Sequence, residues 1–153
     1  MAAALFLLFL AKVAHGAADD ILGLWKDAKR DAIVRIYKCG DRKGSNNYCG
    51  SIAWVKDGPP TDIKNPDPAL RGRPIQGLEI LKGFSYEGKD EWAGGTLYDP
   101  KTGSTYKGHM RLASPDRLRL KGYVLLPLFG RTTTWTRARG MPPGPGGNGG
   151  KKK

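Results

Sequence analysis

Few side chains in this sequence are of the types that perform acid–base or nucleophilic chemistry. Histidine is the commonest acid–base group, and only His109 lies outside the apolar N-terminal segment. It alternates with Lys107 and Arg111, a pattern typical of the solvent-facing side of a strand. No nucleophile-elbow sequence accompanies it. A Ser-His-Asp or Cys-His enzyme is therefore not expected.

A pair of carboxylates performs hydrolysis without histidine, as in glycosidases. Glu79, Glu91 and Asp99 are the candidates for such a pair at the mouth of a barrel. However, Asp99 begins a DPKTG turn, where Asp normally caps the turn, and Glu91 directly follows another turn. We therefore predict that the protein is not an enzyme.

Metal and cofactor motifs are equally weak. Asp62, Asn65 and Asp67 faintly resemble a calcium loop but lack its sixth-position Gly and twelfth-position Glu, and Asx turns around the neighbouring prolines explain them better. Two cysteines without a nearby His supply too few ligands for zinc. No Gly-rich phosphate loop or dinucleotide fingerprint occurs. The sequence predicts neither a metal nor a cofactor.

Both ends of the chain differ in composition from the body. Residues 1–18 hold an apolar run followed by small residues, which predicts a secretory signal peptide cleaved after Gly16 or Ala18. The alternative, a transmembrane anchor, needs about 20 apolar residues, roughly twice this run. Residues 139–153, RGMPPGPGGNGGKKK, predict a disordered basic tail. We expect a periplasmic or secreted protein without a transmembrane segment.

Residues 19–138 form the body, long enough for one domain. They hold 21 Lys and Arg against 14 Asp and Glu, a net charge of +7. A basic body favours anionic partners, and export argues against nucleic acid. In an oxidising compartment, Cys39 and Cys49 are expected to form a disulfide that contributes about 3 kcal/mol, with two free thiols as the alternative.

Short segments of strand-forming residues, divided by Gly, Pro and Asp turns, organise the body. No segment sustains a helical period over three turns. Eight strands at this spacing favour a small closed antiparallel all-β barrel, because closure removes exposed edges. Residues 57–77, with five prolines, predict a loop that caps, lines or closes something. The predicted strands are residues 22–26, 32–39, 49–56, 78–86, 91–98, 104–112, 117–125 and 131–137.

Alternation predicts the buried face of the sixth and seventh strands. Met110 and Leu112 share the apolar face of one strand, and Leu118, Leu120 and Val124 share that of the other. The basic residues between them point outward.

Pairing these two strands with their buried faces matched makes Arg111 face Arg119 and His109 face Lys121. Like charges directly opposed on a sheet are destabilising, so this surface invites an anion. Solvated side chains that splay apart are the alternative. We call Lys107, Arg111, Arg119 and Lys121 the basic patch.

Five stretches occur in order along the body: GLW (23–25), IYKCG (36–40), NPDPALRGRPIQGLEIL (65–81), GGTLYDPKTGSTY (94–106) and GRTTTWTR (130–137). Together they resemble the bacterial domain-of-unknown-function family 2147. This chain departs from the family by lengthening the segment between its cysteines with RKGSNNY, and by its basic tail.

The resemblance implies a small exported protein with a lipocalin-like barrel, and it implies no reaction. Such barrels begin with Gly-x-Trp and pack this Trp under an Arg from the last strand. Gly23 and Trp25 match the first half, and Arg131 or Arg137 is the candidate for the second, through cation–π stacking. We expect these residues to close the barrel rather than to bind a ligand.

The interior or mouth of a barrel is a favoured place for small ligands. We predict that the protein binds a small, largely apolar ligand, including one with an acidic group held by arginines of the long loop. The alternative is that side chains fill the barrel. The alternative function is binding of anionic envelope polymers or lipids by the basic patch and the Lys-rich tail. The predicted ligand-binding residues are Tyr37, Trp54, Arg71, Arg73, Tyr98 and Trp135.

Overall fold

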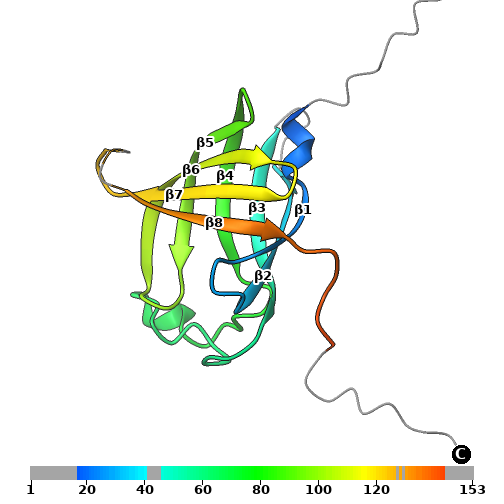
Figure 1. Cartoon of the computed structure of the whole chain (residues 1–153). Helices are drawn as coiled ribbons and strands as arrows, with labels where there is room; N and C mark the ends of the chain where they lie inside the picture. Colours follow the sequence, from blue (N-terminus) through cyan, green and yellow to red (C-terminus); the bar gives the residue numbers. More distant parts are fainter. Residues whose placement is uncertain (1–16, 41–45, 127, 129, 144–153) are drawn as a thin grey trace, which may run out of the picture.

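The computed structural model describes residues 17–40, 46–126, 128 and 130–143. Within this part of the chain, antiparallel strands follow one another around a closed barrel, and the last strand returns to pair with the first (Figure 1). The predicted fold class is confirmed. The strands are β1 (Gly23–Lys26), β2 (Ala32–Cys39), β3 (Asn47–Val55), β4 (Glu79–Gly88), β5 (Glu91–Asp99), β6 (Ser104–Ser114), β7 (Arg117–Tyr123) and β8 (Arg131–Arg137).

The two ends of the chain lie mostly outside the described residues. The predicted signal peptide, residues 1–18, is described only at positions 17 and 18, and the predicted tail, residues 139–153, only as far as 143. Two short 3-10 helices flank the early strands, η1 (Ala17–Ile21) and η2 (Pro68–Leu70). Within the described part of the chain, no helix has the length and apolar character needed to span a membrane.

Turn chemistry sets the strand boundaries. Lys89 and Asp90 adopt φ values of 53° and 60° between β4 and β5, the conformation that tight hairpin turns require. In the next turn, the Asp99 carboxylate accepts the backbone N–H of Lys101 at 2.9 Å. The expectation that Asp99 caps this turn therefore agrees with the structure.

The seventh strand ends earlier than expected. We expected it to continue to residue 125 with Val124 on the buried face, but it ends at Tyr123 and Val124 is 69% exposed. On one side β8 begins at Arg131, which pairs with Gly122, and on the other side the ladder with β6 ends where Tyr123 pairs with Lys107. The expected continuation, residues 124 and 125, therefore pairs with neither neighbouring strand.

The core fills the middle of the barrel. The indole of Trp25 is fully buried and its N–H donates to the Ile21 carbonyl at 2.8 Å, which ties η1 to the first strand. A second, smaller cluster packs the long loop onto β3. The main cluster is Ile21, Trp25, Val34, Ile36, Tyr48, Leu81, Phe84, Trp92, Met110, Leu118, Leu120 and Trp135.

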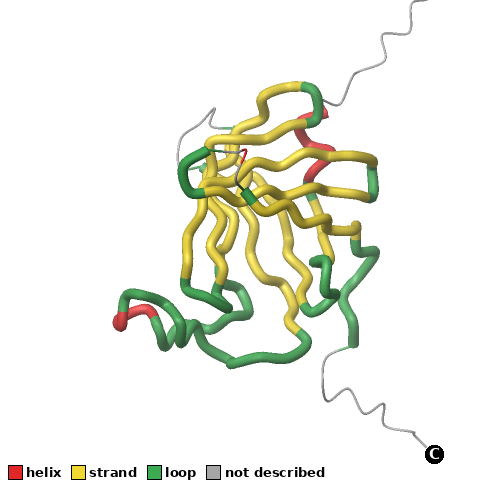
Figure 2. The backbone as a smooth tube through the Cα atoms, turned by 60° about the vertical axis from the view of Figure 1, so that its left-hand side comes forward, coloured by secondary structure: helices red, strands yellow, loops and turns green. Residues whose placement is uncertain are grey.

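The long loop between β3 and β4 folds back against the barrel. Ile75 and Leu78 are buried against Ile52, and the Leu78 carbonyl accepts the Ile52 N–H at 2.9 Å. An isolated β-bridge pairs Thr61 with Pro74 and so holds the two arms of the loop side by side. Figure 2 shows it running along one end of the barrel with η2 at its outermost point.

Candidate functional site

The middle of the barrel has little room for a ligand, because one aromatic ring occupies it. Gly95 and Gly108 face each other across β5 and β6, and a Cβ atom on either would collide with the ring of Phe84. Phe84 is itself fully buried. The two glycines therefore exist to admit this ring, which is a packing requirement rather than a binding device.

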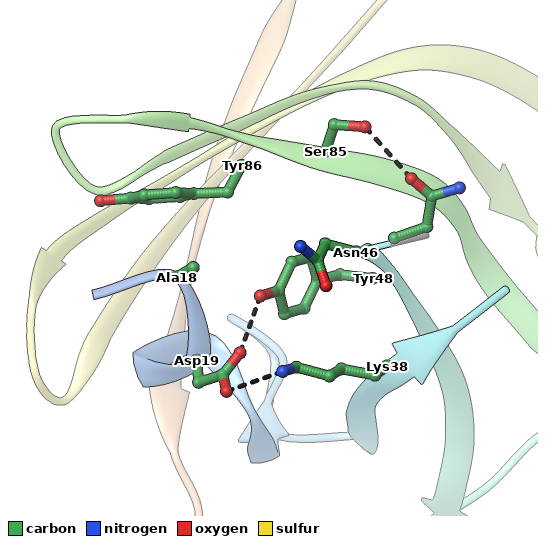
Figure 3. A pocket seen from close by; sticks show the side chains of 8 residues that line it. Ala18, Asp19, Lys38, Asn46, Tyr48, Ser85 and Tyr86 are labelled. Atoms are coloured by element: carbon green, nitrogen blue, oxygen red, sulfur yellow. Dashed lines mark hydrogen bonds and ion pairs between the residues drawn. The ribbon is translucent and has the colours of Figure 1, made fainter. Parts of the chain in front are cut away.

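A polar pocket of about 390 Å³ lies where η1 meets β2, β3 and β4 (Figure 3). The Asp19 carboxylate in its lining accepts the Tyr48 hydroxyl at 2.8 Å and pairs with the Lys38 ammonium at 2.8 Å. Burial, and then the hydrogen bond to Asp19, raise the pKa of Tyr48. These groups already satisfy one another, so they fasten η1 to the barrel.

A second pocket of about 360 Å³ lies between the long loop and the outer side of β4, β5 and β6. We call it the loop pocket. Thr96 lines it and is exposed, whereas its neighbour Gly95 faces the core, which places the pocket on the outer wall. Its lining residues are Asn65, Pro66, Leu70, Arg73, Leu78, Glu79, Ile80, Lys82, Thr96, Tyr98 and Thr105.

A buried carboxylate holds the wall of the loop pocket in place. Asp62 is 0% exposed, and its Oδ1 accepts the Tyr98 hydroxyl at 2.6 Å. Its Oδ2 accepts Asn65 Nδ2 at 2.8 Å and Arg73 Nε at 3.0 Å, and the Nη2 of the same guanidinium lies 2.9 Å away. Arg73 also lies over the Tyr98 ring, 5.7 Å from its centroid.

The electrostatics of this cluster keep Asp62 ionised. Burial alone would raise the pKa of its carboxyl, but the hydrogen bonds from Tyr98, Asn65 and Arg73, with the charge of Arg73, outweigh burial and lower the pKa. Burial and the bond to Asp62 raise the pKa of Tyr98. Asp62 thus compensates the charge of Arg73, which leaves that arginine poorly suited to a second anion.

The structure separates the six residues predicted to bind a ligand. Arg73 and Tyr98 meet at the loop pocket. Arg71 lies beside it, with its Nε donating to the Asn65 carbonyl at 2.8 Å. Trp135 is a buried member of the core.

Neither Tyr37 nor Trp54 lines the loop pocket, although Tyr37 contacts the lining residue Glu79. The Tyr37 hydroxyl donates to Glu79 at 2.9 Å and accepts the Ser51 hydroxyl at 3.1 Å. Trp54 pairs with Ile33 while Val34 pairs with Ile52, so a bulge at Ala53 turns Trp54 to the face opposite the core residue Val34. Simple alternation keeps Trp54 on the face of Ile52, and the bulge moves it to the face of Ile33, where its Nε1 is buried.

The structure also contains the residues predicted to crosslink the chain and to close the barrel. Cys39 and Cys49 are joined by a disulfide. Arg137 lies over Trp25 with its guanidinium carbon 4.2 Å from the ring centroid. Arg131 sits at the other end of β8. Of the two arginine candidates, the structure therefore selects Arg137.

The basic patch has the register expected from alternation. Arg111 faces Arg119 and His109 faces Lys121 across β6 and β7, and Lys107 faces Tyr123. Glu91 partly compensates it, lying 3.8 Å from Arg111 and 3.5 Å from His109. Among the described residues, no carboxylate lies within 4.0 Å of the other three members, Lys107, Arg119 and Lys121.

Candidate catalytic or metal groups do not converge in the described part of the chain. His109 pairs with Glu91 on the outer wall, and Glu79 bonds Tyr37 elsewhere. Among the same residues, no three His, Cys, Asp or Glu side chains gather as a metal ion would require.

Sequence reasoning missed part of the loop pocket and a second feature. Ile80, Lys82 and Thr96 reach the pocket from the outward side of strands, and Leu78 reaches it from the end of the long loop, and we assigned none of them a role. The other feature is a run of exposed apolar side chains between β7 and β8. Its signal was present in the sequence, because VLLPLF breaks the alternation that precedes it.

Known proteins resemble this chain in sequence and in fold. Residues 23–137 match the profile of a family described as "Uncharacterized protein conserved in bacteria (DUF2147)". The fold is similar to that of protein HP1028 from Helicobacter pylori, described as belonging to the lipocalin family, with a TM-score of 0.65 and 23% identity. The similarity covers 76% of this chain and 82% of that one. No curated protein matches the sequence significantly.

Proposed function

We propose that this chain, which belongs to the bacterial family DUF2147, binds a small amphipathic ligand in the loop pocket and catalyses no reaction. The observation that carries the proposal is the pocket itself, about 360 Å³ between the long loop and the outer wall. This volume lies at the lower end of the range for small-molecule sites.

The lining of the loop pocket suits a ligand with an apolar body and an acidic end. Leu78 supplies a buried apolar base, Ile80 is a partly buried neighbour, and Leu70 is an exposed apolar side chain at the rim. Lys82 is exposed there, and among the described residues no carboxylate lies within 4.0 Å of it. Because Asp62 compensates Arg73, we assign the acidic end to Lys82.

The fold and the disulfide support this proposal at a coarser level. A lipocalin-like barrel is an architecture suited to binding small molecules near its loops. The Cys39–Cys49 disulfide is of the kind that persists in oxidising compartments, which supports our proposal that the protein is exported to the periplasm or secreted.

A dye with both an apolar body and an anionic group, 1-anilinonaphthalene-8-sulfonate, tests the site. Filling the pocket with Thr96→Phe should weaken dye binding about tenfold. The matched control is Thr134→Phe, an exposed Thr on β8 outside the pocket lining, which should bind as the parent does. Lys82→Gln should weaken binding of the sulfonate, whereas Lys29→Gln should not. Equal binding by Thr96→Phe and Thr134→Phe would remove the loop pocket as the site.

The basic patch supports a second candidate function, binding of polyanions. The observation that favours it is the facing pair Arg111 and Arg119 beside Lys107 and Lys121, with Glu91 the single acidic side chain among the described residues that is bridged to the patch. With heparin as the probe, Lys107→Gln/Lys121→Gln should lower affinity and reduce the slope of log affinity against log salt by about 2. The control, Lys29→Gln/Lys56→Gln, removes the same charge elsewhere. An equal loss in both variants would mean that only net charge matters.

A further inference from the structure

We propose that the exposed apolar side chains at positions 124–126 and 128, between β7 and β8, insert into the surface of an anionic lipid bilayer, with the basic patch lying against the headgroups. The proposal rests on the second function above, anion binding by the patch, and adds a site of different chemistry. We call Val124, Leu125, Leu126 and Leu128 the apolar tip.

The apolar tip is unusually exposed for its composition. Val124, Leu125, Leu126 and Leu128 are 69%, 83%, 57% and 80% exposed. Single exposed apolar residues are ordinary on protein surfaces, but four gathered in one connection mark an interaction site. Figure 1 shows this connection projecting from the barrel at the ends of β7 and β8, away from η1 and from the long loop.

Cations surround the base of the tip. Lys121 precedes Val124 by three residues and Arg131 follows Leu128 by three, a span of at most about 10 Å along an extended chain. Lys107 faces Tyr123, the last residue of β7. No carboxylate among the described residues lies within 4.0 Å of these three cations. An anionic bilayer has acyl chains beneath charged headgroups. The apolar tip would therefore reach the acyl chains, and the cations at its base would lie at the level of the headgroups.

A second copy of the chain fits this surface less well. A two-fold interface through the tip would place the same patch on both sides and bring Lys107, Lys121 and Arg131 toward their own copies. Like charges at an interface oppose association, and the chain as a whole carries +12. A bilayer with anionic lipids supplies the opposite charge and needs no complementary shape.

Co-flotation with vesicles tests the proposal on the full chain. The probes are vesicles of phosphatidylcholine alone and with about 30% phosphatidylglycerol. We expect binding to the anionic vesicles only. Leu125→Glu/Leu128→Glu should weaken it at least about tenfold, and Lys107→Gln/Lys121→Gln should weaken it about fivefold per lysine at low salt. The control for the tip is Ile63→Glu, which changes an apolar side chain 54% exposed on the long loop and should leave vesicle binding unchanged.

Insertion has its own spectroscopic signature. In Leu126→Trp, the added fluorescence should shift to the blue on anionic vesicles and be quenched by lipids brominated on the acyl chains. An unshifted, unquenched emission from a bound protein would overturn insertion and leave only headgroup contact.

Heparin binding distinguishes a failure of the bilayer-insertion proposal from a failure of the anion-binding function of the basic patch. If Leu125→Glu/Leu128→Glu floats like the parent while Lys107→Gln/Lys121→Gln fails to bind heparin, the tip is not an anchor and the patch function stands. If neither variant changes vesicle or heparin binding, both proposals fall. If the parent is dimeric by light scattering and Leu125→Glu/Leu128→Glu is monomeric, the tip is a self-association surface and the bilayer proposal is wrong. Circular dichroism establishes that each variant is folded.

Discussion

The guanidinium of Arg137 lies over the indole of Trp25, 4.2 Å from the ring centroid, and so joins the last strand to the first. The same group donates to backbone carbonyls of Pro115, Leu22 and Asp20 at 2.7, 3.0 and 2.7 Å. The β1–β8 seam needs this support because its ladder pairs only Trp25 with Arg137 and Lys26 with Thr136. Arg137 therefore reinforces a short ladder at the seam where the barrel closes.

Arg137→Lys should destabilise the fold although it keeps the charge. Lysine lacks the planar fork that reaches several carbonyls while stacking on a ring. We expect a loss of about 2 kcal/mol in the free energy of unfolding, measured by chemical denaturation. Arg131→Lys, at the opposite end of β8, should change it by less than about 0.5 kcal/mol. Equal losses in the two variants would contradict a special role for Arg137.

Reducing the Cys39–Cys49 disulfide should lower the free energy of unfolding by about 3 kcal/mol, through the added entropy of the unfolded chain. Cys39→Ala/Cys49→Ala should show a similar loss and no further response to reductant. Denaturation curves with and without dithiothreitol measure both. A parent protein that is insensitive to reductant while its disulfide is demonstrably broken would contradict this account.

Gly108→Ala tests whether the barrel interior is filled. The added methyl would collide with the Phe84 ring, and overpacking of this kind costs about 1–3 kcal/mol. The smaller side chain in Phe84→Leu should make the double variant less unstable than the sum of the two single losses. Gly72→Ala, whose Cβ would meet nothing within 4 Å, is the control. Full tolerance of Gly108→Ala would reveal unused interior space.

Asp62→Asn should destabilise the loop pocket in a pH-dependent way. The folded pKa of Asp62 lies below its unfolded value, so its ionised form stabilises the fold above the unfolded pKa, and this stabilisation is lost as the pH falls through the folded pKa. At neutral pH we expect Asp62→Asn to cost about 2–3 kcal/mol. The difference from the parent should shrink below about pH 4.

Urea denaturation of both proteins across this pH range measures the difference directly. Asp57→Asn, at an exposed position, controls for the loss of a negative charge. A gap between parent and Asp62→Asn that stays constant from neutral to acid pH would contradict ionisation of Asp62 as its cause.

Most of the fold was predictable because period-two alternation and turn residues act locally. The strand from Arg117 begins as expected after its Pro-Asp turn, and Arg111 faces Arg119 as the matching of buried faces requires. The end of this strand was not predictable in the same way. Whether Val124 joins a sheet depends on where the ladders with β6 and β8 end, which is a property of the partner strands.

The site was less predictable because its residues belong to the outer wall. A bulge at Ala53 places Trp54 on the face opposite Val34, and one inserted residue is invisible to alternation. Asp62 resembled an ordinary turn residue, and only the folded loop shows it buried beneath Arg73 and Tyr98. Prediction placed Arg73 and Tyr98 in one site but assigned Arg73 to an external anion rather than to Asp62.

Native mass spectrometry most directly tests the central claim, that the loop pocket binds a small ligand. The parent and Thr96→Phe should be purified from the cells that make the protein and measured before and after organic extraction. The account predicts a defined added mass on the parent that extraction removes and that Thr96→Phe lacks. The same added mass on both proteins would place the ligand elsewhere, and an unliganded mass for the parent would contradict ligand binding by the pocket.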